Sequence, residues 1–311
     1  MGKATREAYG EALKELGARC RDIVVLDADL SKSTKTNVFG KAYPDRFFNV
    51  GIAEQNLMGT AAGLAAAGKI PVVSTFAMFA AGRAFEQVRN SICYPKLNVK
   101  IAATHAGLTV GEDGASHQAI EDISLMRTIP NMTVIVPADA TETRQALAWA
   151  IEYKGPVYLR LGRASVPDVF GDGYEFHHGK AVQLAEGADL TIVATGIMVG
   201  PARQAADELI QSGLSARVLN IHTIKPIDRE AIAKAATDTG AVVTCEEHSI
   251  IGGLGSAVAE ALVESHPVPM ERVGVMDTFG ESGTPDALLA KYNLTVADVV
   301  RAAKRVVARK R

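Results

Sequence analysis

Short runs of apolar and β-branched residues alternate along this chain with longer helical stretches, and this alternation is the feature that most constrains the fold. In the first half the runs are residues 23–26, 71–74, 99–102, 133–136 and 157–159, and we predict helices over residues 6–18, 54–67, 80–93, 117–127 and 140–153. The runs are apolar throughout, as in strands that are covered on both faces. Strands that alternate with helices form parallel sheets. The pattern therefore predicts an α/β fold.

The same alternation resumes after an irregular stretch. The second set of predicted strands is 190–193, 217–220, 242–244 and 273–275, and the second set of predicted helices is 201–212, 229–236, 256–264 and 296–308. Between the two sets, residues 167–187 are rich in glycine and acidic residues, as an interdomain linker is. A chain of 311 residues that is 48% hydrophobic can build two cores. We predict one domain over residues 1–166, a linker over 167–187 and a second domain over 188–311.

Composition excludes several classes of protein. The 33 basic and 35 acidic side chains give a formal net charge of −2, which excludes a broad basic surface for nucleic acid. The three cysteines form no C-x-x-C pair, so we expect neither a disulfide framework nor a structural zinc site. The first residues lack the apolar segment of a signal peptide, and the most apolar stretch, residues 57–67, is too short to span a bilayer. We expect a soluble, cytoplasmic protein without a membrane partner.

The densest group of chemically capable side chains follows the predicted strand 99–102. His105, Asp113 and His117 lie there in a glycine-rich loop that precedes a predicted helix. Ligands bind beyond the carboxyl ends of the strands in open parallel sheets, so this loop is a candidate site. A solvated loop in which Asp113 caps a turn is the alternative. The spacing of the three residues matches no metal motif, and we predict no metal site in this chain.

Two further clusters follow other predicted strands. Glu54 begins a predicted helix rich in alanine and glycine. Its carboxylate could bind a ligand, or it could only interact favourably with the positive end of the helix dipole. Phe76 and Phe79 follow the strand 71–74, and such a pair of aromatic residues more often belongs to the core than to a site. From position alone, both interpretations stay open for each cluster.

Together the three clusters resemble the pyrimidine-binding domain of transketolases. The resemblance rests on Gly51-Ile-Ala-Glu54-Gln, on Thr75-Phe76 with Phe79, and on Thr104-His105 continuing to Gly111-Glu-Asp113-Gly-x-x-His117-Gln. It extends through residues 125–131, 137–139 and 161–163, and residues 245–255 are similar to the C-terminal domain of the family. It implies a pyrimidine-type parallel-sheet domain that binds thiamine diphosphate, followed by a smaller α/β transketolase C-terminal domain.

One part of the family's pattern is absent. Enzymes of this kind hold the diphosphate and Mg²⁺ with a Gly-Asp-Gly segment followed by an asparagine. The one such triplet here, at residues 171–173, lies in the predicted linker and has no suitable asparagine after it. The chain thus resembles the C-terminal subunit of a split transketolase. The resemblance implies that an N-terminal partner subunit binds most of the Mg²⁺ and the diphosphate, in a heterotetramer of two copies of each subunit.

The resemblance also implies roles for residues at the cofactor. Glu54 would hydrogen-bond the ring nitrogen of the aminopyrimidine and take part in its proton transfer, and His117 would lie beside its amino group. Phe76 and Phe79 would stack on the ring, and Asp29 would lie near the cofactor, although a helix cap would explain this aspartate equally well. The family's third aromatic residue is missing from residues 80–83, so we expect that part of the cradle to be altered or supplied by Phe85.

For the substrate, the resemblance implies a phosphate site and a hydroxyl contact. Arg6, Ser33, His105 and Arg163 match family positions around the sugar phosphate, where arginine presents a planar fork of donors. Asp113 would accept a hydrogen bond from a sugar hydroxyl. The catalytic residues implied are Glu54, His117 and His105.

The implied reaction transfers a two-carbon ketol unit from a ketose phosphate to an aldose phosphate, as in the pentose phosphate pathway. A part of a 1-deoxyxylulose-5-phosphate synthase and the beta subunit of a 2-oxo-acid dehydrogenase are the alternative enzymes. The synthase suits a separate chain of this length poorly, and the dehydrogenase subunits lack the loop with both histidines. A non-catalytic paralogue that only binds a partner is the alternative outside enzymes, although such a protein needs none of Glu54, His105, Asp113 and His117.

Overall fold

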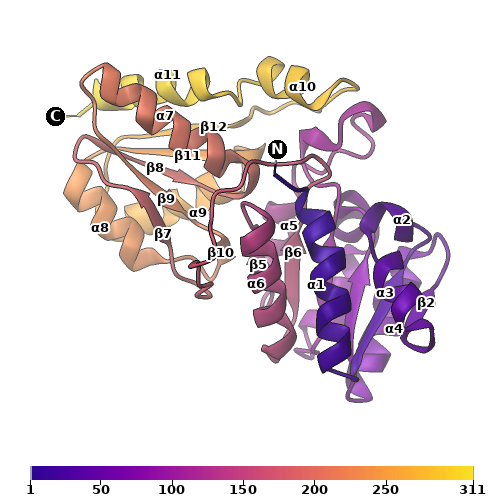
Figure 1. Cartoon of the computed structure of the whole chain (residues 1–311). Helices are drawn as coiled ribbons and strands as arrows, with labels where there is room; N and C mark the ends of the chain where they lie inside the picture. The colour runs from indigo at the N-terminus through magenta and orange to yellow at the C-terminus, as the bar shows by residue number, and fades with distance from the viewer. Residues whose placement is uncertain (1, 311) are drawn as a thin grey trace.

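The structure is a computed structural model that describes residues 2–310, and it contains two mostly parallel sheets, each covered by helices (Figure 1). The first sheet has the strand order β10-β5-β6-β4-β3-β1-β2. Its own elements are α1 (Thr5–Arg19), β1 (Ile23–Asp27), α2 (Ser31–Thr34), α3 (Asn37–Ala42), β2 (Phe47–Asn49), α4 (Glu54–Ala66), β3 (Ile70–Ser74), β4 (Lys100–Ala103), α5 (Asp122–Thr128), β5 (Thr133–Ile135), α6 (Ala140–Glu152) and β6 (Val157–Arg160). The predicted α/β architecture is confirmed.

The second sheet has the order β12-β11-β8-β9-β7. Its domain comprises β7 (Val182–Ala185), β8 (Leu190–Ala194), α7 (Val199–Gln211), β9 (Ala216–Asn220), β10 (Thr223–Lys225), α8 (Arg229–Thr239), β11 (Val242–Ser249), α9 (Leu254–Val263), β12 (Met270–Val275), α10 (Pro285–Lys291) and α11 (Val296–Val307). Helices α7 and α11 lie side by side over this sheet. No helix within residues 2–310 is long and apolar enough to cross a membrane.

One strand ties the two domains together. β10 leaves the second domain and pairs antiparallel with β5, so that it forms the edge of the first sheet. The backbone carbonyl of His222 accepts a hydrogen bond from the N–H of Val136 at 2.7 Å beside this pairing. The core between the sheets is continuous as well, since Ile224 packs in one buried cluster with residues of β3 and β4. The first sheet is therefore completed by a segment that comes from the second domain.

Several local expectations need correction. β7 falls inside residues 167–187, so the end of the predicted linker is an edge strand of the second sheet. The helix predicted over 80–93 is two π-helical segments, Phe79–Arg83 and Gln87–Cys93. The helix predicted from residue 117 begins only at Asp122, because the preceding residues continue the loop.

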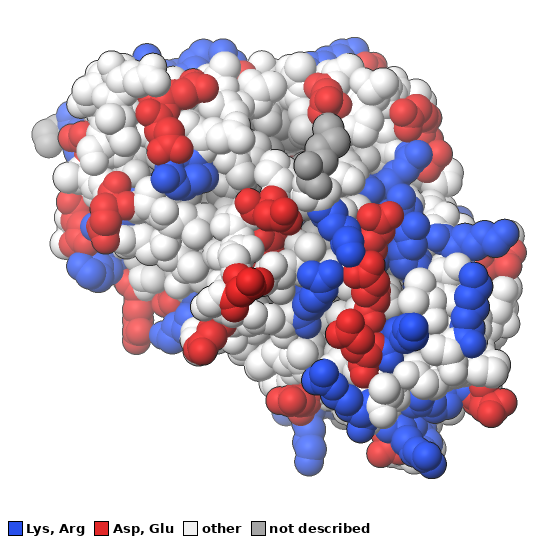
Figure 2. Space-filling view, in the orientation of Figure 1, with Lys and Arg blue, Asp and Glu red and all other residues white. Residues whose placement is uncertain are grey.

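The surface carries charges of both signs. On the face drawn in Figure 2, basic and acidic side chains are interspersed rather than gathered into one broad patch. Pairs on α1 illustrate this, since Glu11 lies 2.7 Å from the Nζ of Lys3 and 3.0 Å from the guanidinium of Arg144 on α6.

Candidate active site

The predicted site residues follow five neighbouring strands of the first sheet at their carboxyl ends. In the order β6-β4-β3-β1-β2, these strands are followed by Arg163, His105, Phe76, Asp29 and Glu54 respectively. Because the strands are parallel, their carboxyl ends lie at one edge, which is where open α/β sheets bind ligands. Residues up to 134 positions apart in sequence thereby share one edge of the sheet.

Four rings pack together at this edge. Phe76 stacks on Phe79 with centroids 5.9 Å apart and on His105 with centroids 3.8 Å apart. His117 meets the ring of Phe79 edge-on at 5.4 Å. The two phenylalanines are thus part of one aromatic cluster with both histidines of the glycine-rich loop. The side chain of Phe85 packs against the hydrophobic core instead of joining these rings, so of the two expectations for the missing third aromatic residue, only the altered cradle remains.

Glu54 is buried at the first position of α4, with only 1% of its surface exposed. Its Oε2 accepts a hydrogen bond from Nη1 of Arg83 at 2.9 Å, and the Arg83 guanidinium lies 4.4 Å from the centre of the Phe79 ring. The sequence stretch that lacks the family's third aromatic residue therefore places a flat cation on the carboxylate and the ring instead. The departure from the family pattern at residues 80–83 is visible in the sequence, but no motif there marks Arg83 as a partner of Glu54.

His105 is buried and sits in a left-handed backbone conformation, with φ of 57°. Its Nε2 lies 3.0 Å from Nη1 of Arg6, and its Nδ1 lies 2.8 Å from the hydroxyl of Thr104. Because arginine can only donate, Nε2 accepts, and Nδ1 carries the proton and donates to Thr104. Burial, followed by the charges of Arg6 and Arg163, lowers the pKa of His105 to about 3. The ring is therefore neutral and holds Arg6 in place.

Basic groups gather around His105. Arg6 donates to the backbone carbonyl of Ser33 at 3.0 Å, so Ser33 contacts Arg6 through its main chain. Arg163 hydrogen-bonds the carbonyl of Val110 and lies 3.2 Å from Glu112. The charges of Arg6, Arg163 and Lys35 all act on the His105 ring. No sequence motif marks Lys35 as a residue of this site.

Asp113 and Asp29 lie at the solvent-exposed rim. The carboxylate of Asp113 lies 3.9 Å from Arg163. Asp29 has a left-handed backbone with φ of 64°, and the amide of Asn49 both accepts from its N–H and donates to its carboxylate at 3.0 Å. The pairing with Asn49 therefore fixes Asp29. The N-terminus of α2 receives no side-chain capping hydrogen bond, so Asp29 does not cap this helix.

Some polar atoms of this edge are left free for a ligand. Nε of Arg6 and the hydroxyl of Thr75 are buried and have no hydrogen-bond partner within residues 2–310. Together with the buried carboxylate of Glu54 and the flat faces of Phe76 and Phe79, they fit a planar, nitrogen-containing ring with an anionic substrate beside it. No group of three or more His, Cys, Asp or Glu in the described part of the chain is placed to hold a metal ion.

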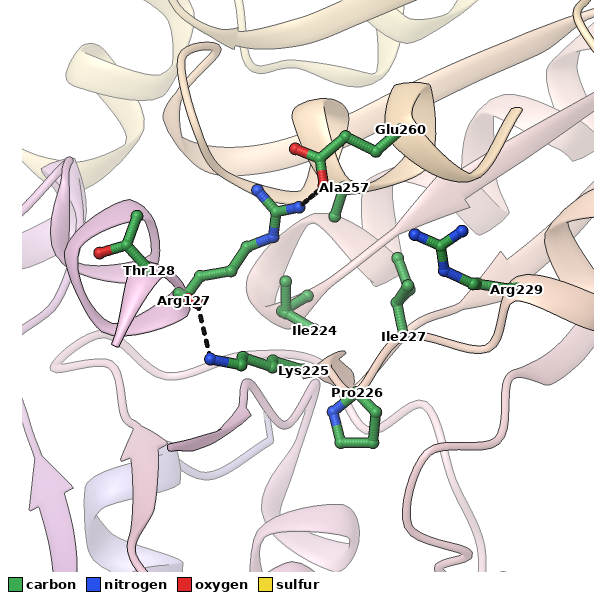
Figure 3. Close-up of a pocket in the computed structure, with 9 residues that line it drawn as sticks. All are labelled: Arg127, Thr128, Ile224, Lys225, Pro226, Ile227, Arg229, Ala257 and Glu260. Carbon is green, nitrogen blue, oxygen red and sulfur yellow. Dashed lines mark hydrogen bonds and ion pairs between the residues drawn. The ribbon is translucent and has the colours of Figure 1, made fainter. Parts of the chain in front are cut away.

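A separate cavity of about 440 Å³ opens where α5 meets the second domain (Figure 3). Its cations are all engaged. Arg127 pairs with Glu260, Nζ of Lys225 donates to the carbonyls of Arg127 and Ile129, and Arg229 pairs with Glu264. None of its lining residues belongs to the cluster around Glu54 and His105.

Comparison with known proteins agrees with this geometry. Residues 1–168 match the family described as "Transketolase, pyrimidine binding domain", and residues 179–299 match "Transketolase, C-terminal domain". The chain therefore belongs to the transketolase family. It is 52% identical over 295 residues to a putative transketolase C-terminal section from Methanocaldococcus jannaschii, a match that covers 94% of this chain and 92% of that protein.

Two further relatives carry more specific names. The chain is 48% identical over 305 residues to a 6-deoxy-6-sulfo-D-fructose transketolase subunit from Clostridium sp. strain MSTE9, covering 98% of this chain and 95% of that one. A solved structure described as a split gene transketolase, inactive beta4 tetramer, superposes with a TM-score of 0.94 at 63% identity, covering both chains completely. The resemblance to a subunit of a split transketolase is confirmed.

Proposed function

We propose that this chain is the catalytic C-terminal subunit of a two-chain transketolase, and that with a partner N-terminal subunit it transfers a two-carbon ketol unit from a ketose phosphate to an aldose phosphate. The observation that carries the proposal is one constellation: a buried carboxylate beside stacked aromatic rings, flanked by three cations on the same sheet edge. A scaffold that only bound a partner would need none of these groups together.

Thiamine diphosphate fits the first half of this constellation and supplies the carbon nucleophile and electron sink of ketol transfer. Glu54 would hydrogen-bond its ring nitrogen, after Arg83 has moved from the carboxylate, and Phe76 and Phe79 would contact the ring face. His117 lies at the edge of the same rings and would hold or move a proton between cofactor and substrate. Asp29 would contact the cofactor from the exposed rim. Mg²⁺ and the diphosphate would be held mainly by the partner.

The second half of the constellation fits an anionic sugar. Arg6 and Arg163 would donate to the terminal phosphate, with His105 orienting Arg6 and the Ser33 segment closing one side. Asp113 would accept from a sugar hydroxyl and so read its configuration. The names of relatives include a sulfonated ketose, which shares with a sugar phosphate a tetrahedral anionic group at the remote end.

The domain assignment follows from this proposal. Residues 1–166 would carry the residues that bind cofactor and substrate. The second domain would contact a second copy of this chain and the partner subunit. The assembly would be a cytoplasmic heterotetramer with two copies of each subunit. The synthase and dehydrogenase alternatives rank lower, because relatives of the same length carry transketolase names. The relative named as a beta4 tetramer is described as inactive, which agrees with a need for the partner.

The test is a comparison of the chain alone with the chain mixed with candidate partners, each given thiamine diphosphate, Mg²⁺ and a ketose phosphate. We expect no ketol transfer by the chain alone and transfer once a subunit with the Gly-Asp-Gly segment is added. Turnover by the purified single chain, with contamination excluded, would refute the two-chain assignment.

A further inference from the structure

The glycine-rich loop of the site, residues 107–118, belongs to the first domain but is held in part by side chains and backbone of the second domain. Glu247 of β11 is buried, with 3% of its surface exposed, and its Oε1 accepts a hydrogen bond from the backbone N–H of Thr109 at 2.6 Å. The contact spans 138 positions of sequence and crosses the domain boundary. Thr109 is the second residue of the 3₁₀ segment Leu108–Asp113, whose last residue is Asp113.

The backbone of the loop is shaped around this carboxylate. Gly107 has φ of +82°, and a Cβ placed there would lie 2.2 Å from the carboxyl carbon of Glu247. Any larger residue would therefore push the carboxylate away, besides straining the backbone. Gly107 allows the side chain from the second domain to reach the N–H of Thr109.

The loop is also clamped on its other side. Nε2 of Gln118 donates to the carbonyls of Leu108 and Gly111 within the loop and to that of Glu281 at 2.9 Å in the second domain. Gly111 approaches the carbonyl of Gly283, just before α10, and Arg163. The loop thus lies between β11 and α10, and Arg163 is attached to it through the carbonyl of Val110.

Glu246 and Glu247, consecutive residues of β11, accept hydrogen bonds on opposite faces of the sheet. Successive side chains of a strand point to opposite sides. Glu246 accepts from the N–H groups of Leu254 and Gly255 at 2.7 and 2.8 Å and so holds the start of α9 within its own domain. Glu247 turns the other way, toward the loop of the first domain. A buried carboxylate is costly unless it is hydrogen-bonded, and each of these two finds backbone donors.

We propose that Glu247 is a positioning residue for substrate binding: through Thr109 it fixes the loop 107–118, and thereby the places of Asp113 and Arg163 at the sugar-phosphate site. This inference rests on the proposed function and gives the second domain a part in it. The second domain then does more than assemble subunits, because one of its side chains sets the geometry of the substrate loop.

Hydrogen exchange of the full chain, followed by mass spectrometry, tests the contact without cofactor, partner or turnover. Glu247→Asp keeps the charge but is one methylene too short to reach Thr109, and Glu247→Gln keeps the reach and a carbonyl acceptor but removes the charge. We expect exchange in residues 108–113 to rise about ten-fold in Glu247→Asp and to stay near the wild-type rate in Glu247→Gln. Glu246→Asp is the matched control. It should raise the exchange rate of residues 254–256 and leave the exchange rate of the loop at the wild-type value.

The link to substrate is measured in the same variants after assembly with the partner. Glu247→Asp should raise the KM for the phosphorylated sugar by a larger factor than it lowers kcat. Glu247→Gln should leave this KM near the wild-type value. Loop exchange that is unchanged in Glu247→Asp, or equally raised in Glu246→Asp, would overturn the contact. An unchanged KM with a loosened loop would overturn the role in substrate binding. A complete lack of ketol transfer in the wild-type assembly would instead count against the proposed function.

Discussion

Removing the guanidinium of Arg163 should weaken capture of phosphorylated sugars selectively. A hydrogen bond to a charged group contributes roughly 1.5–3 kcal/mol, which corresponds to about a 10- to 100-fold loss in kcat/KM. The Arg163 side chain is 35% exposed, and Arg6 and Lys35 remain beside the site after its removal. We therefore expect the loss for Arg163→Ala near the lower end, about ten-fold.

The assay compares two acceptors in the assembled enzyme. In Arg163→Ala, kcat/KM for a phosphorylated aldose should fall by the full factor. For glycolaldehyde, which carries no phosphate, kcat/KM should change little. The comparison is needed because Arg163 also holds the loop through the carbonyl of Val110, so its loss has a structural component. Arg144→Ala is the matched control, since this half-exposed arginine on α6 pairs with Glu11 on the surface. Equal losses for both acceptors would refute the reasoning and make Arg163 a support of the loop alone.

Three further changes probe the cofactor half of the site and the histidine that holds Arg6. Glu54→Gln should lower kcat by about 10²–10⁴ at saturating cofactor with little change in Tm, because the amide oxygen can still accept from Arg83; a near-wild-type kcat would contradict the proton-transfer role. Arg83→Ala should tighten thiamine diphosphate binding to the assembled subunits by roughly five-fold in calorimetric titration, because a competing ion pair and a contact with the Phe79 ring, together about 1 kcal/mol, are lost; unchanged or weaker binding would oppose this. His105 takes up a proton near pH 6.5 when unfolded but has a native pKa of about 3, so its contribution to stability is complete above pH 6.5 and is lost as the pH falls toward 3. The gap in Tm between the wild type and His105→Asn should accordingly narrow from pH 7 to pH 4, and a constant gap would exclude this titration.

The strands of the parallel core could be predicted from the sequence because their signal is local. An apolar, β-branched run such as residues 23–26 has few alternatives to a buried strand, and the structure extends it by one residue, to Asp27. The strands that escaped prediction lie at sheet edges. β2, β7 and β10 are three or four residues long, and two of them pair antiparallel, so neither length nor pattern marks them.

The helical stretch after β3 shows a second limit. Its apolar spacing predicts one helix over residues 80–93, and the chain there is helical, but as two π-helical segments that Ala84 helps to separate. The wider turn is not encoded in periodicity, because Arg83 also contacts Glu54, which lies 29 positions earlier in the sequence. Residues 117–121 likewise remain loop, where Gln118 reaches the second domain.

The residue types of the site and their positions after strands were determined by the sequence: carboxylate, aromatic pair, histidines and arginines each follow an apolar run, and a parallel sheet brings such ends to one edge. Which of these side chains touch was decided only in the folded chain. The stacking of His105 on Phe76, the acceptor role of its Nε2 toward Arg6, and the placement of Arg83 on Glu54 all depend on distances between strands. The contact of Glu247 with Thr109 depends on how two domains pack. Such contacts between residues far apart in sequence leave no local pattern, and so the tertiary structure alone reveals them.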